Sequence, residues 1–197
     1  MLRIALTGGI GTGKSTASKF LNDLGAFIFD ADKEAKNILN NNETVQSELI
    51  AEFGTDIMSG DEKIDNNKLS RIAFQDQDHQ LKLNSIIHPY VFQEIDKIFD
   101  NVLEKGRNDI FVIDAALIYE SGADTHMDYV IVITALLKIR MERALQRETL
   151  TRDEILKRID LQWPEEDKIA LADFVIHNDS TEKELLNSIT DIYNQLV

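Results

Sequence analysis

The chain has 197 residues, 43% of them hydrophobic, which suits a compact domain and excludes a globally disordered protein. It contains no cysteine, which excludes disulfides, thiol catalysis and cysteine-ligated zinc. Its net charge of -14 disfavours nucleic acid and anionic membranes as partners, because a strongly acidic surface repels both.

The N-terminal sequence predicts a strand, a glycine-rich loop, a helix and a second strand. Residues 3–6 form a short apolar run typical of a buried strand. After the glycines, one helical face collects the apolar residues Ala17, Phe20, Leu21 and Leu24, and Gly25 is placed to end that helix. A second apolar run, 27–29, ends at the sequence Asp30-Ala31-Asp32. This order is the first half of a parallel α/β unit.

The segment from about 33 to 107 is polar and asparagine-rich, and we predict that it is a helical insertion. Apolar runs then return at 110–113, 129–133 and 174–176. Short apolar runs separated by helical stretches indicate a parallel sheet that is buried on both faces. We therefore predict an α/β protein, a three-layer sandwich with a five-stranded parallel sheet. It is expected to be a single domain over 1–197, with its core at about 1–32, 108–139 and 159–197.

The clearest functional signal is the run Gly8-Gly9-Ile10-Gly11-Thr12-Gly13-Lys14-Ser15, which matches the P-loop pattern at every fixed position. Glycines let the backbone wrap around phosphate, and successive N–H groups form an anion-binding nest at a helix N-terminus. The lysine is expected to reach the β- and γ-phosphates, and the serine hydroxyl to bind Mg²⁺. The pattern predicts an ATP and magnesium site formed by Gly9, Gly11, Thr12, Gly13, Lys14, Ser15 and Thr16.

Acidic residues follow two of the predicted strands. Asp32 lies just past the carboxyl end of the second strand, where open α/β sheets bind ligands, so it is a candidate base for an acceptor hydroxyl. A helix N-cap or a loop role is the alternative, and Asp30 competes for the same function. Asp114 ends the third strand, a position from which it would support magnesium, although a capping or turn role is equally open.

Positive charge gathers at residues 138–158, which hold seven Lys or Arg against four Asp or Glu. Arg140, Arg143 and Arg147 follow the spacing i, i+3 and i+7, which predicts that one helical face projects all three. Guanidinium groups pair well with phosphate oxygens, so we expect a lid over ATP at about 140–158. A solvated helix of mixed charge is the alternative.

Two aromatic side chains leave their roles open. His88 precedes Pro89, and a histidine in that position is more often a turn or packing residue than a catalyst. Trp163 is suited either to stack on adenine or to pack against neighbouring residues.

Together these motifs resemble the dephospho-CoA kinase family over nearly the whole chain. The resemblance rests on five elements in order: the P-loop of residues 6–16, Asp30-Ala31-Asp32, Leu83-Asn84 with His88-Pro89, the pair Arg143 and Arg147, and the block 162–178. Two positions depart from the family pattern. Ala116 stands where the family usually has proline, and Asn66 aligns where it often has arginine.

The resemblance implies transfer of the ATP γ-phosphoryl group to the ribose 3′-hydroxyl of dephospho-CoA. It implies Asp32 as the base, Lys14, Arg143 and Arg147 as catalytic cations, and Asn178 beside the adenine. The helical insertion becomes the acceptor-binding region, with acceptor contacts from His88, Pro89 and Leu117. Magnesium is expected at Ser15 and Asp114.

Proteins with other functions also contain a P-loop, and the residues alone leave two such functions open. A related kinase of a nucleoside monophosphate or another small metabolite is one, and a nucleotide-binding regulatory module is another. We expect a cytoplasmic protein that has no nucleic acid, membrane or obligate protein partner.

Overall fold

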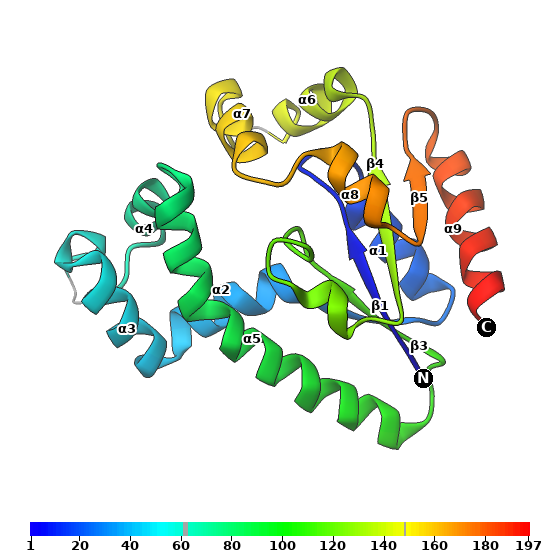
Figure 1. Ribbon diagram of the computed structural model, residues 1–197, viewed down its shortest axis with the longest axis horizontal. Helices are drawn as coiled ribbons and strands as arrows, with labels where there is room; N and C mark the ends of the chain where they lie inside the picture. The colour runs from blue at the N-terminus through cyan, green and yellow to red at the C-terminus, as the bar shows by residue number, and fades with distance from the viewer. Residues whose placement is uncertain (61–62, 148) are drawn as a thin grey trace. The chain divides into compact units, whose positions relative to one another are not determined.

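The computed structural model describes residues 1–60, 63–147 and 149–197 (Figure 1). Glu148, which falls in the predicted lid, lies outside the described residues. The chain forms two compact units, the first of residues 1–30 and 97–197, the second of residues 31–96. The first unit holds the sheet and the second is helical.

The sheet of the first unit has five strands in the order β2-β3-β1-β4-β5, and every neighbouring pair is parallel. The strands are β1 (Leu2–Thr7), β2 (Phe27–Asp30), β3 (Ile110–Asp114), β4 (Tyr129–Thr134) and β5 (Phe174–His177). All five predicted strands and the α/β class are therefore confirmed. The register sets Asp30 opposite Asp114, so both acidic residues stand at the carboxyl edge.

Helices α1 (Lys14–Asp23) and α9 (Glu182–Leu196) share one hydrophobic core with β1, β3, β4 and β5. The predicted apolar face of α1 buries Ala17, Phe20 and Leu21 there. Phe111 is fully buried, and its ring packs against Phe27 at 5.2 Å and edge-on against Phe99 of α5 at 5.3 Å. Every residue of β3 is buried, as expected of a sheet covered on both faces.

The second unit contains α2 (Ala31–Asn41), α3 (Glu43–Phe53), a short 3₁₀ turn, α4 (Asn66–Ala73) and most of α5 (Gln77–Lys105). Its core is built around the buried residues Val45, Leu49, Ile57 and Leu69. The helical character predicted for about 33–107 is thus observed.

Pro89 lies inside α5, so of the two roles that the sequence favours for His88, a turn or a packing residue, the structure shows packing. Proline removes one backbone donor from a helix, and packing along the rest of this long helix outweighs that loss.

The positively charged segment folds as α6 (Leu137–Leu145) and α7 (Arg152–Asp160), which is followed by α8 (Glu165–Leu171). The prediction of one arginine face is wrong, because α6 ends before Arg147 and that residue lies in the following turn. Thr151 and Glu154 form a reciprocal capping box that starts α7. Among the described residues, none of the helices combines the length and apolar character needed to cross a membrane.

Candidate active site

The P-loop joins the end of β1 to the start of α1, at the carboxyl edge of the sheet (Figure 1). Gly11 and Gly13 have φ of 79° and 98°, left-handed values that favour glycine, and Gly13 caps the N-terminus of α1. Thr12 N–H donates to the Gly9 carbonyl at 3.3 Å, which closes the loop on itself. Lys14 and Ser15 open the helix, so its N-terminal partial positive charge and the predicted phosphate-binding residues coincide.

Lys14 forms an ion pair with Asp114 from the end of β3. The two residues are one hundred positions apart, and the parallel pairing of β1 with β3 brings them together. Ser15 is exposed in the first turn of α1. Hard oxygen donors are thus available from the Ser15 hydroxyl and the Asp114 carboxylate, the donor chemistry that Mg²⁺ requires. No group of three or more histidine or acidic side chains suited to a metal occurs in the part of the chain that the structure describes.

Asn178, which follows β5, is buried, and its Nδ2 donates to the Thr12 carbonyl at 2.8 Å. Arg143 from α6 donates through Nη1 to the backbone carbonyl of Asn178 at 2.9 Å. The two residues that the family resemblance assigns to ATP are therefore linked to each other and to the P-loop. Arg147 is exposed in the turn after α6.

Arg140, the third arginine of the predicted cluster, is only 4% exposed and lies against the outside of the P-loop. Its Nε donates to the Ile10 carbonyl at 3.0 Å, and its Nη1 lies 3.4 Å from Glu165 Oε1 of α8. Glu165 also accepts a hydrogen bond from the Thr134 hydroxyl at 2.9 Å. Arg140 is thus held inside the protein, so the expectation that it is displayed on an exposed lid face is wrong.

The residues predicted for the acceptor side lie in different parts of the chain. Asp32 is exposed in the first turn of α2, so it belongs to the second unit and is not the N-cap of that helix. His88 packs at 6.0 Å from Phe92, and burial lowers the pKa of its imidazole below the usual value. Pro89 is exposed on the same helix, and Leu117 is half-buried in the turn after β3.

The two departures from the family pattern also have definite surroundings. The Ala116 carbonyl accepts a hydrogen bond from the Thr7 hydroxyl at 3.4 Å. Asn66 begins α4 and donates to Asn40 at 3.0 Å within the second unit.

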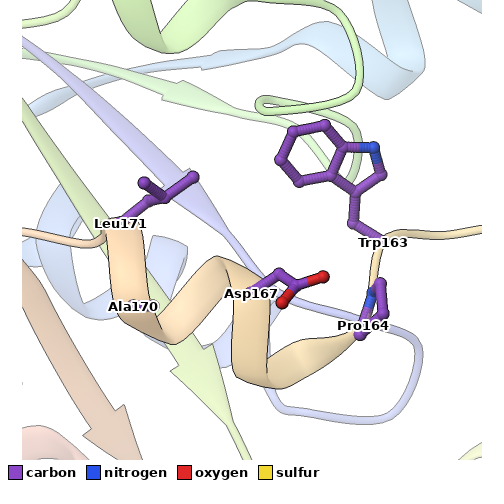
Figure 2. A pocket seen from close by; sticks show the side chains of 5 residues that line it. All are labelled: Trp163, Pro164, Asp167, Ala170 and Leu171. Carbon is purple, nitrogen blue, oxygen red and sulfur yellow. The ribbon is translucent and has the colours of Figure 1, made fainter.

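Trp163 stands at one side of a surface pocket and Leu171 at the other, with Asp167 of α8 between them (Figure 2). The indole is 42% exposed and stacks on Tyr119 at 6.2 Å, so it packs as one of its two predicted roles requires. Burial raises the pKa of Tyr119 to about 12, and the charges of Asp124 and Asp173 act in the same direction.

Sequence reasoning missed the residues that support the site from outside. Glu165, which accepts a hydrogen bond from Thr134, pairs with Arg140, and the fully buried Lys168 lies 2.8 Å from Glu120. Each pair joins segments that are distant in sequence, so no local pattern indicates them. A glutamate and a lysine in an amphipathic helix otherwise predict only a solvated face.

Comparison with known proteins gives consistent results. A family model described as dephospho-CoA kinase matches residues 2–184. Dephospho-CoA kinase of Carboxydothermus hydrogenoformans is 38% identical over 93% of this chain and 90% of its own length, and that of Fusobacterium nucleatum is 36% identical over 94% of each.

Solved structures agree with the sequence matches. A crystal structure from Thermus thermophilus matches with a TM-score of 0.80 and 26% identity over 100% of this chain and 98% of that one. Dephospho-CoA kinase from Campylobacter jejuni matches with a TM-score of 0.69 and 26% identity over 98% and 96%. Shikimate kinase from Acinetobacter baumannii, at a TM-score of 0.56 and 13% identity over 99% and 94%, shares the fold alone.

Proposed function

The chain belongs to the dephospho-CoA kinase family, and on that premise we propose how its residues carry out the reaction. The enzyme transfers the γ-phosphoryl group of ATP to the ribose 3′-hydroxyl of dephospho-CoA, which gives coenzyme A and ADP. The family match favours this acceptor over a nucleoside monophosphate. ATP is assigned as the phosphoryl donor on one observation: the P-loop lies at the carboxyl edge of the sheet, and its Lys14 pairs with Asp114.

The P-loop binds the ATP phosphates through the backbone N–H groups of Gly9 to Thr16. Lys14 leaves Asp114 to contact the β- and γ-phosphates, where its charge offsets the charge that develops during transfer. The ion pair between Lys14 and Asp114 supports this role, since it places the ammonium group beside the loop.

Magnesium would be held by the Ser15 hydroxyl and supported by the Asp114 carboxylate. When bound, the ion would neutralise charge on the phosphate oxygens and orient them. Mg²⁺ is typically bound by one or two protein oxygens together with phosphate and water, which the donor set of these two residues fits.

Asp32 accepts the proton of the ribose 3′-hydroxyl. At the same time the oxygen of that hydroxyl bonds to the γ-phosphorus, and ADP departs. Its exposed carboxylate, two residues beyond β2, supports this assignment. His88, Pro89 and Leu117 contact the acceptor. Burial lowers the pKa of His88, which favours the neutral imidazole over the charged form.

Arg143 and Arg147 stabilise the transferring phosphoryl group from the segment of α6 and α7, which closes as a lid. Arg143 exchanges its bond to the Asn178 carbonyl for phosphate oxygens, while Asn178 stays beside the adenine. The location is cytoplasmic, where ATP is available as the donor, and no nucleic acid, membrane or obligate protein partner is needed.

The function is tested by incubating the protein with ATP, Mg²⁺ and dephospho-CoA and measuring both products. Coenzyme A and ADP should appear in equal amounts, and a dephospho-CoA analogue without the 3′-hydroxyl should yield neither phosphorylated product nor stimulated ADP release. A panel of nucleoside monophosphates serves as the comparison. Folded protein that binds ATP but phosphorylates another acceptor faster than dephospho-CoA would refute the proposal.

A further inference from the structure

The outer side of the P-loop is packed against one buried cation, the guanidinium of Arg140. It is 4% exposed, so its charge requires partners that are held in place. One partner is the Ile10 carbonyl at 3.0 Å, and the other is Glu165, at 3.4 Å. Glu165 is itself held by the Thr134 hydroxyl at the end of β4. A chain of polar contacts therefore runs from the sheet through α8 and α6 to the loop.

The contact with Ile10 determines where the next amide points. The Ile10 carbonyl and the Gly11 N–H belong to one planar trans peptide, so they point in opposite directions. A donor that holds the carbonyl outward therefore directs the Gly11 N–H inward, toward the space that the loop encloses. Asn178 has the same effect further along the loop. Its side chain donates to the Thr12 carbonyl, and this bond directs the Gly13 N–H of the same peptide.

Arg140 lies so close to the P-loop that there is no room for a side chain at Gly9 or Gly11. A Cβ added to Gly9 would lie 2.5 Å from Glu165 Oε1 and closer still to Arg140 Nη2. One added to Gly11 would lie 2.9 Å from the Arg140 Cα. Gly9 is not among the glycines with positive φ, so its requirement is for space rather than for a left-handed backbone.

We propose that Arg140, held by Glu165, is a positioning residue that orients the Gly11 N–H of the P-loop for the phosphates of ATP. Arg140 itself does not touch the nucleotide. The proposal rests on the proposed function only in that the P-loop binds ATP. The same arginine lies on α6, about one helical turn before Arg143, so it anchors the start of the predicted lid segment to the loop.

The first test compares Arg140→Lys, Arg140→Ala and Glu165→Gln with the unchanged protein. Both Arg140 variants should weaken ATP affinity and raise the KM for ATP about tenfold, because lysine keeps the charge but not the planar, two-sided donor. The KM for dephospho-CoA should stay within about twofold. Glu165→Gln should shift ATP affinity in the same direction by less. Lys183→Ala, which removes an exposed positive charge from α9, is the matched control and should change neither constant.

The second test uses the space around Gly9. Gly9→Ala should weaken ATP binding in the presence of Arg140, and adding Arg140→Ala should relieve part of that loss. The fold-loss of ATP affinity in the double variant should therefore be at least fivefold smaller than the product of the fold-losses in the two single variants. Independent, multiplicative losses would overturn the proposal, because they would mean that the loop and the arginine act separately.

ATP binding is measured by calorimetry as well as by kinetics, which separates the two proposals. ATP affinities within about twofold of the unchanged protein, in Arg140 variants that keep their melting temperature, would overturn the positioning role. Absence of turnover with dephospho-CoA in the unchanged protein would instead overturn the proposed function, while the ATP affinities of the variants would still decide the role of Arg140.

Discussion

Replacing Lys168 with methionine tests the buried ion pair that ties α8 to the loop after β3. Lys168 is fully buried and its Nζ lies 2.8 Å from Glu120 Oε1, which also accepts the backbone N–H of Trp163 at 2.9 Å. Methionine keeps most of the aliphatic volume and removes the charge, so it leaves a carboxylate that is only 10% exposed without its counterion. Removing one partner of a buried pair costs about 3–5 kcal/mol, and we expect a loss of that size in the free energy of unfolding.

The assay is urea unfolding followed by tryptophan fluorescence and by far-UV circular dichroism. Trp163 is the single tryptophan and adjoins the pair, so its fluorescence reports on this region. Lys183→Met on the exposed face of α9 is the control and should change stability by less than about 0.5 kcal/mol. Adding Glu120→Gln to Lys168→Met should recover part of the loss, since no unpaired charge remains. A loss below about 1 kcal/mol for Lys168→Met would refute the argument, because it would mean that water compensates the carboxylate.

Three further outcomes follow from the site. Lys14→Ala should lower kcat by about 10²–10³ through lost charge stabilisation, and near-normal turnover would contradict its role. Asp32→Asn should lower kcat while calorimetry shows nearly unchanged ATP affinity; if ATP binding is lost instead, Asp32 supports the metal or the fold. Because the pKa of Tyr119 is raised to about 12, its phenol stays protonated in the folded protein at a pH where an unfolded tyrosine ionises. The protonated Tyr119 phenol therefore contributes fully to the free energy of unfolding below about pH 10, and this contribution is lost as the pH rises toward 12. Denaturant titrations of Tyr119→Phe should lack that decline.

Local sequence was sufficient for most of the fold. The five apolar runs became the five strands, and the glycine run joined β1 to α1 as predicted, because both features depend on neighbouring residues. The limits of individual helices were harder to predict, and the shared helical face expected for the three arginines is wrong. The long helix α5 includes Pro89, and α6 stops before Arg147, since packing decides where a helix continues or ends.

The sequence by itself determined the P-loop, the order of strands along the chain and the family resemblance, since these depend on residue type and spacing. Only the tertiary structure decided the partners of the buried charges. Parallel pairing set Asp114 beside Lys14, and packing of α6 and α8 enclosed Arg140 with Glu165 and Lys168 with Glu120. Spacing along a helix tells which face a charge occupies, but a charge removed from water must meet a counterion, and that counterion comes from whichever distant segment the fold brings against it.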